Sequence, residues 1–134
     1  MLQAAGVTAA EYLKRANSQT LVFAMIETQE ALDDLDGIAK VKGVDGLFVG
    51  PSDLSIALTN GEKIDRLGAG TLAAMKKVQA ACKANDLVPG AFAGTLDGIK
   101  AYSELGFQFM AGPTDTDLLR TGAAAFLPSV GKAS

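Results

Sequence analysis

Short apolar runs alternate along the chain with longer stretches in which apolar residues recur at every third or fourth position. Compact apolar runs are typical of strands that are buried on both faces, and the longer spacing is typical of helices with one buried side. The third run is the weakest strand candidate, because Pro89 and Gly90 lie near its start. The expected strands are Thr20–Glu27, Gly46–Val49, Leu87–Phe92 and Phe107–Ala111.

Residues that favour helix ends bound the stretches between these strands. Thr8 and Glu11 have the spacing of a capping box, and Gly43 and Gly106 stand where helices commonly stop. The expected helices are 8–17, 28–41, 71–85, 95–105 and 116–127, with a short helical turn after Gly50-Pro51. Strict alternation of strand and helix predicts an α/β fold with a parallel sheet.

The chain divides into a leader and a strand–helix unit that occurs four times. Residues 1–19 are expected to form a leader helix and loop, and residues 20–130 a (β/α)4 domain. A weak internal repeat places Gly50-Pro51-Ser52-Asp53 after the second strand and Gly112-Pro113-Thr114-Asp115 after the fourth. Both segments put a hydroxyl and a carboxylate at the carboxyl end of a strand, where parallel α/β sheets bind ligands.

Composition narrows the class of protein. The 134 residues are 49% hydrophobic and 20% charged, which is enough apolar material for a packed core. Twelve basic and fifteen acidic residues give a net charge of −3 without a basic cluster, which argues against a nucleic-acid partner. The longest apolar run, Leu21–Ile26, is too short for a membrane helix, and no secretory signal is visible. The single Cys82 fits a reducing compartment, so a cytoplasmic location is expected.

The chain contains no histidine. It therefore supplies neither a Ser-His-Asp triad nor a histidine metal site or general base. The lysines fall on expected helices or their ends, in a loop or in the tail, whereas a Schiff-base lyase in a barrel needs a lysine at the inner or top end of a strand, so imine chemistry is disfavoured. Carboxylates, hydroxyls and backbone amides remain as the candidate functional groups.

Two carboxylates follow neighbouring strands. Glu27 ends the first strand and Asp53 follows the second, so both belong at the same edge of a parallel sheet. Such a pair suits a hard divalent cation such as Mg²⁺ or Mn²⁺. The alternative, that Glu27 merely precedes a helix and Asp53 merely caps one, stays open. The amides of the Gly50-Pro51-Ser52 turn could hold a small carboxylate, and Phe92 is near enough to touch it.

Two longer segments, Val22–Ala31 and Gly43–Ser55, resemble the HpcH/HpaI aldolase family, and Tyr102–Phe107 and Asp115–Leu119 resemble its C-terminal segments. The resemblance implies a class II aldolase that cleaves 4-hydroxy-2-oxo acids to pyruvate and an aldehyde through a metal-stabilised enolate. It implies that Glu27 and Asp53 are the ligands of Mg²⁺ or Mn²⁺, with Co²⁺ as another possibility. It also makes Gly50, Pro51 and Ser52 the cradle for the carboxylate of pyruvate.

The chain departs from the family in length and in two functional residues. The family fold is a (β/α)8 barrel of about 250 residues, and the four strands here resemble its last four. The family's catalytic histidine and substrate-binding arginine belong to the first half, and Arg15, Arg66 and Arg120 match neither. The loop 56–70 also diverges. We therefore expect the C-terminal half of a TIM barrel, with no catalytic base in this chain and no activity when it is alone.

Three alternatives remain open from the sequence. Two copies of a half-barrel could close into a homo-oligomer, or one copy could pair with a complementing N-terminal half. The chain could be a binding module without catalysis. It could also belong to a citrate-lyase-type acyl-CoA lyase, although the sequence motif Gly50–Ser55 favours aldolases that act on free acids. The sequence does not choose the metal, the oxo acid or the aldehyde.

Overall fold

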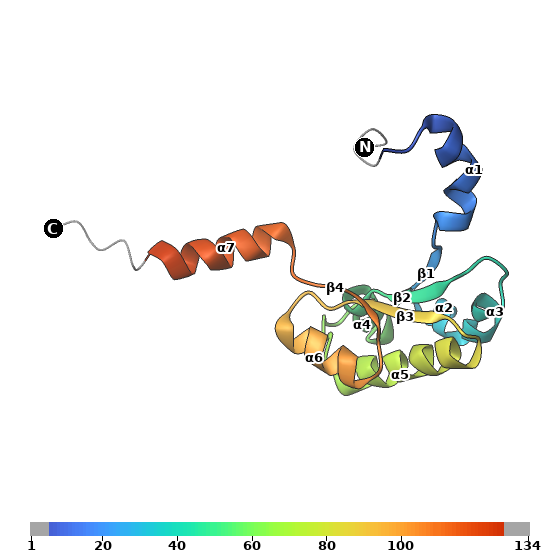
Figure 1. The fold of residues 1–134 in the computed structure, drawn as a ribbon. Helices are drawn as coiled ribbons and strands as arrows, with labels where there is room; N and C mark the ends of the chain where they lie inside the picture. Colours follow the sequence, from blue (N-terminus) through green and yellow to red (C-terminus); the bar gives the residue numbers. More distant parts are fainter. Residues whose placement is uncertain (1–5, 128–134) are drawn as a thin grey trace.

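The computed structural model of the chain describes residues 6–127. Its centre is a sheet of four parallel strands in the order β1-β2-β3-β4 (Figure 1). The strands are β1 (Phe23–Ile26), β2 (Gly46–Val49), β3 (Val88–Phe92) and β4 (Phe109–Ala111). Each strand pairs with the next one along the chain, so the expected parallel α/β arrangement is confirmed.

Seven helices connect or flank the strands in the described part of the chain. One expected helix, 28–41, is divided in two because Asp34 has φ of −106° and ψ of 23°, outside the helical range. The turn expected after Gly50-Pro51 is an eight-residue helix. The helices are α1 (Ala9–Gln19), α2 (Gln29–Asp33), α3 (Leu35–Ala39), α4 (Pro51–Leu58), α5 (Ala69–Ala84), α6 (Leu96–Glu104) and α7 (Asp115–Phe126).

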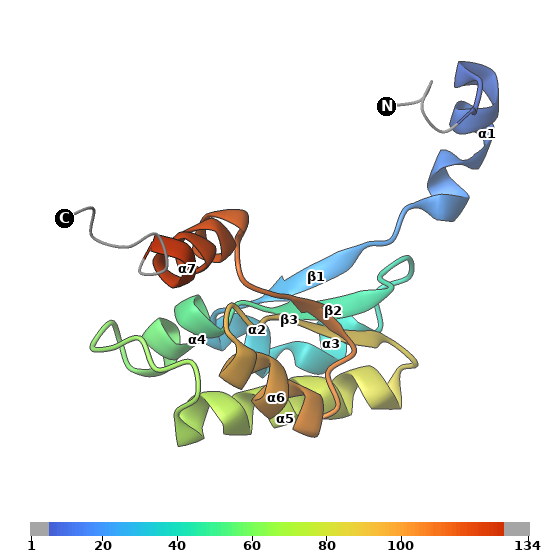
Figure 2. The same ribbon diagram turned by 60° about the vertical axis from the view of Figure 1, so that its left-hand side comes forward.

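Helices α2 to α6 cover one face of the sheet, as Figure 2 shows. The core lies between this face and the helices, where Leu47, Val49 and Ala91 are fully buried. The main helical contribution comes from α5, which buries Met75, Val78 and Cys82 on the side that faces the sheet.

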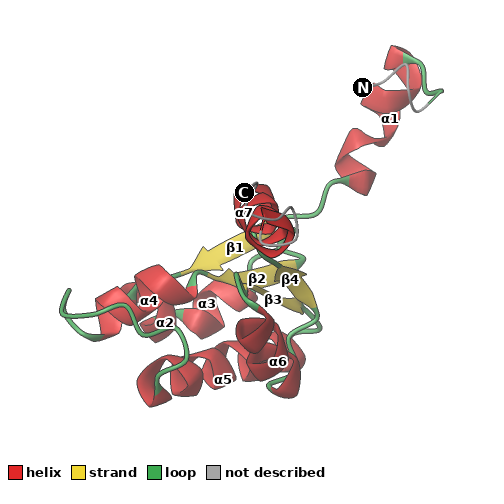
Figure 3. Cartoon of the chain, turned by 90° about the vertical axis from the view of Figure 1, so that its left-hand side faces the viewer, coloured by secondary structure: helices red, strands yellow, loops and turns green. Residues whose placement is uncertain are grey.

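Two helices stand away from this body. Figures 1 and 3 show α1 and α7 projecting from the sheet and its helices. Neither helix has a buried residue, although both begin with a capping threonine, Thr8 for α1 and Thr114 for α7. The expected leader thus contains a helix, and the expected domain end at residue 130 lies outside the described residues. No helix between residues 6 and 127 is long and apolar enough to span a membrane.

The second face of the sheet carries aromatic rings instead of helices. Phe23 of β1 and Phe109 of β4 stack with ring centroids 4.9 Å apart, and Phe48 of β2 meets Phe109 edge-on at 6.1 Å. Gly46 and Gly90 leave room for these rings, because a Cβ atom at either position would collide with Phe23 or Phe48. The sheet therefore curls around this face, as the wall of a barrel does.

Candidate metal and substrate site

The carboxyl ends of the strands form one rim. Ile26, Val49 and Ala91 stand in one row across β1, β2 and β3. The residues one step further along the three strands are Glu27, Gly50 and Phe92. The register thus brings three of the residues expected from the sequence to the same level of the rim.

Distances measured from Gly50 show that the carboxylates of Glu27 and Asp53 are close to each other. A Cβ atom built at Gly50 would lie 2.7 Å from Oε2 of Glu27 and 3.8 Å from Oδ2 of Asp53. The two carboxylate oxygens are therefore no further apart than these two distances combined. The absence of a side chain at Gly50 leaves the space that the Glu27 carboxylate occupies.

Local structure explains where each carboxylate lies. Glu27 stands between the last residue of β1 and Thr28, whose hydroxyl accepts a hydrogen bond from the Ala31 amide at 3.2 Å and caps α2. Asp53 lies in the first turn of α4, which begins after Gly50 with a proline at its first position. The end of β1 and the start of α4 thus place both carboxylates at the rim.

Helix α4 is held firmly beneath the rim. Leu54 is fully buried, and its amide donates to the Gly50 carbonyl at 2.9 Å. The Ser55 hydroxyl is also buried and donates to the Ser52 carbonyl at 2.7 Å. The first amides of a helix have no acceptor within it, so those of Ser52 and Asp53 are available to an anion beside Gly50.

The donor set at the rim suits a hard cation. In the described part of the chain, neither Glu27 nor Asp53 has a side-chain hydrogen bond or ion pair. Two acidic side chains without a positive neighbour repel each other, and a cation between them relieves that repulsion. No cluster of three or more metal-ligating side chains occurs among residues 6–127, so further ligands would be water or substrate oxygens.

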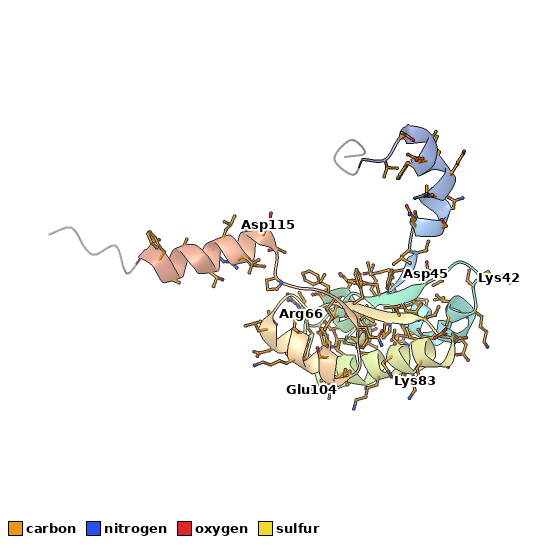
Figure 4. The ribbon with its side chains drawn as sticks, viewed as in Figure 1. Lys42, Asp45, Arg66, Lys83, Glu104 and Asp115 are labelled. Atoms are coloured by element: carbon orange, nitrogen blue, oxygen red, sulfur yellow. The ribbon has the colours of Figure 1, made fainter. Side chains whose placement is uncertain are left out.

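Other expected features take structural roles. Cys82 is fully buried in α5, and burial raises its pKa, in line with core packing. The second Gly-Pro segment forms the cap of α7, where the Asp117 amide donates to the Thr114 hydroxyl at 3.2 Å. Asp115 accepts from the neighbouring Thr116 amide at 2.7 Å and lies at the start of α7, the helix that projects from the sheet (Figure 4).

Sequence reasoning missed one residue at the rim. Arg66 lies in the divergent loop between α4 and α5, and its Nη1 atom is 3.4 Å from the position of a Cβ on Gly94, just after β3. Only the fold brings Arg66 to this place, because no local pattern in the loop marks it.

A parallel α/β fold with an acidic pair at its rim is common to several enzyme classes, and comparison with known proteins identifies the family. The model of the HpcH/HpaI aldolase/citrate lyase family matches residues 2–121. The chain belongs to this family. This confirms the resemblance inferred from the Glu27 and Asp53 segments.

Known relatives show how much of the family fold is present. A 4-hydroxy-2-oxo-heptane-1,7-dioate aldolase of Shigella flexneri is 36% identical over 126 residues, covering 92% of this chain and 46% of that protein. A family member of known structure from Burkholderia cenocepacia J2315 superposes with a TM-score of 0.78 at 32% identity, over 96% of this chain and 50% of the other. An HpcH/HpaI aldolase from Desulfitobacterium hafniense DCB-2 gives 0.76 at 27% identity, over 96% and 49%. The chain spans about half the length of these relatives, as expected for a half-barrel.

Proposed function

We propose that this chain is the metal-binding half of an aldolase that cleaves 4-hydroxy-2-oxo acids to pyruvate and an aldehyde. The observation that carries the proposal is the convergence of the Glu27 and Asp53 carboxylates around Gly50. Membership of the aldolase/citrate lyase family and the relatives named as aldolases support the reaction class.

Each rim residue has a defined part in this proposal. Glu27 and Asp53 bind Mg²⁺ or Mn²⁺, and Co²⁺ has the same charge and accepts the same oxygen ligands. When bound, the cation supplies Lewis-acid polarisation of the 2-oxo group. The turn at Gly50-Pro51-Ser52 holds the carboxylate of pyruvate through the available amides of Ser52 and Asp53, while the ring of Phe92 forms an apolar wall beside it.

Proton transfer needs a group that the rim described above does not supply. The chain has no histidine, and Arg66, which lies beside the rim within the described residues, stays protonated and is no general base. We therefore propose that the catalytic base and the arginine that polarises the substrate come from a second half of the barrel. The chain alone would bind metal and 2-oxo acid without turnover.

The aromatic face favours an association with a second half. Met25 and Phe109 are each 53% exposed on this face, and β1 and β4 each have one edge without a partner strand in residues 6–127. Open strand edges beside exposed apolar surface favour pairing with another sheet. A second copy of this chain or a complementing N-terminal half would cover the aromatic face. If no partner supplies the catalytic base, the chain is a binding module without catalysis.

The choice between aldolase and acyl-CoA lyase rests on the relatives. The family description includes citrate lyases as well as aldolases. The relative from Shigella flexneri is named for a dicarboxylic oxo acid, 4-hydroxy-2-oxo-heptane-1,7-dioate, and matches nearly the whole chain. We propose a free 2-oxo acid as the substrate of the whole protein on this ground.

Metal binding is the direct test. Titration of the chain with Mn²⁺ in the presence of oxalate, a two-carboxylate analogue of the pyruvate enolate, should show one saturable site. Glu27→Gln and Asp53→Asn should each abolish it. Glu104→Gln and Asp86→Asn are matched controls, because both acids are exposed and precede β4 and β3, at the opposite end of the parallel sheet from Glu27 and Asp53. Binding that survives both rim variants, or is equally lost in the controls, would contradict the proposed site.

A further inference from the structure

The loop between α4 and α5 is fixed by buried hydroxyl groups. The Ser55 hydroxyl, 1% exposed, accepts from the Asp65 amide at 3.0 Å, and the Thr71 hydroxyl, 4% exposed, donates to the Asp65 carbonyl at 2.8 Å. The fully buried Tyr102 donates its hydroxyl to the Arg66 carbonyl at 3.0 Å. Three buried polar side chains from three helices thus hold the backbone at Asp65 and Arg66, which fixes where the Arg66 side chain begins.

The guanidinium of Arg66 lies beside the rim. Its Nη1 atom is 3.4 Å from the Cβ position of Gly94, and the Phe92 ring approaches the same position at 3.0 Å. Gly94 has φ of +65° and no side chain, so it leaves this space to Arg66 and Phe92. Arg66 has no ion-pair partner among the described residues. Its charge is therefore available to a ligand.

A cavity of about 540 Å³ adjoins this guanidinium. Besides Arg66 and Thr95, its lining includes Arg120 and Thr121 from the middle of α7. The charge of Arg120 is balanced by Asp117, with Nη2 and Oδ1 2.7 Å apart, so Arg66 gives the cavity its net positive charge. Figure 4 shows Arg66 near the start of α6 and the segment that leads to α7.

The cavity adjoins the carboxyl end of β3, because Gly94, two residues after Phe92, lines it. Gly50 follows β2 and Phe92 ends β3, and these strands are neighbours in the sheet. Neighbouring strands are about 4.8 Å apart, so the backbones of Gly50 and Phe92 lie about one strand spacing from each other, and Gly94 and Arg66 line the cavity beyond Phe92. A ligand held at Gly50 that extends over Phe92 would direct its far end toward this cavity, where the planar donors of a guanidinium match a carboxylate.

We propose that Arg66 binds the second carboxylate of a dicarboxylic 2-oxo acid whose 2-oxo end lies at Glu27 and Asp53. This inference rests on the proposed function and adds to it a residue that selects dicarboxylic over monocarboxylic substrates. The hydroxyl of Thr95 and that of Thr121 line the same cavity and are available to the same carboxylate.

The test compares two ligands that differ only in the far carboxylate. 2-Oxoheptanedioate and 2-oxoheptanoate have equal length, and neither has the 4-hydroxyl group that cleavage requires. In the presence of Mg²⁺, calorimetry on the unmodified chain should show about ten-fold tighter binding of the dioate, the gain expected of a charge-assisted hydrogen bond. Arg66→Gln should remove this preference, Arg66→Lys should keep part of it, and Arg15→Gln on α1 should keep all of it.

The outcomes separate this inference from the proposed function. Equal affinities for the two ligands in the unmodified chain, or an undiminished preference in Arg66→Gln, would overturn the role of Arg66 while leaving the metal site intact. If instead the chain binds no metal but still prefers the dioate through Arg66, the metal site fails and the Arg66 site stands. Inorganic phosphate that displaces the dioate at equal concentration would show a general anion site and would also overturn the inference.

Folding of the variants is checked independently. The side chain of Arg66 is exposed and the buried hydroxyls hold only its backbone, so Arg66→Gln should unfold at the temperature of the unmodified chain. Tyr102→Phe is a second variant that leaves the Arg66 side chain in place but removes the bond to its carbonyl. A reduced dioate preference in Tyr102→Phe, with unchanged binding of 2-oxoheptanoate, is the result expected if the loop positions Arg66.

Discussion

The rings of Phe23 and Phe109 stack at 4.9 Å although they belong to the first and last strands of the sheet. Strands this far apart in a flat sheet would hold their side chains about 14 Å apart, at roughly 4.8 Å for each strand step. The contact therefore requires strong curvature, which Gly46 and Gly90 permit because the rings pass over them. The same curvature draws the ends of the strands toward one another and concentrates Glu27, Asp53 and Arg66 at one rim.

Gly50→Ala should weaken metal binding without unfolding the chain. The new methyl group would lie 2.7 Å from Oε2 of Glu27, and the flexible carboxylate is the part that must move. We expect the affinity for Mn²⁺ to fall about ten-fold or more, as for the loss of a group that orients a ligand. Titration calorimetry measures this, with Gly70→Ala as the control, since nothing lies within 4 Å of that position. A Gly50→Ala chain with normal affinity would mean that Glu27 is not a ligand.

Tyr102→Phe should destabilise the chain by about 1 kcal/mol, the net value of one hydrogen bond. The variant removes the donor to the Arg66 carbonyl but keeps the aromatic ring, which also contacts Phe107. Urea unfolding followed by circular dichroism gives the free energy of unfolding. Tyr12→Phe is the matched control, because Tyr12 is 48% exposed on α1. A loss as large in Tyr12→Phe would contradict the assigned role of the buried hydroxyl.

Alkaline solution should destabilise the fold through Cys82 and Tyr102. Burial raises the pKa of both groups, Cys82 from an ordinary 9.0 and Tyr102 from 10.0. The unfolded chain therefore releases these protons at lower pH than the folded chain, so stability is complete below pH 9 and falls as pH rises above it. Unfolding free energies at a series of pH values from 7 to about 11 measure the decline. Cys82→Ala should remove the part that begins near the thiol's ordinary pKa.

The aromatic face should mediate association of the chain. Covering Met25 and Phe109 removes apolar surface from water, so we expect sedimentation to give a mass above that of the monomer. Phe109→Lys should shift the mass toward the monomer. Leu96→Lys is the control, because Leu96 is 71% exposed on α6 and lies on the helical side. A monomer at about 100 μM, well above the dissociation constants of specific dimers, would exclude self-association through this face.

The order of the helices and strands could be predicted from the sequence, but the long-range contacts between them could not. The strands around Leu47 and Ala91 were predictable because their residues are apolar on both faces. The break at Asp34 was not, because the apolar spacing continues on both sides of it. The place of Arg66 in the fold could not be predicted from the sequence for another reason. Its position depends on Tyr102, 36 residues away, and no local pattern records such a hydrogen bond.

The acidic pair shows the reverse situation. Glu27 and Asp53 were predictable because parallel neighbouring strands end at one edge, a rule that needs no side-chain detail. What the sequence left out was the distance between them. That distance depends on Gly50, whose missing side chain makes the space for Glu27.

The sheet and helices α2 to α6 of this chain share one core, as the burial of Leu47, Val49 and Met75 illustrates. A segment with its own core is a unit that recombination can move between genes without first losing its fold. The acidic pair and Arg66 travel together on this unit. Under the proposed function, a different partner half joined to this unit would meet the same two carboxylates and the same guanidinium, and would itself contribute the proton chemistry.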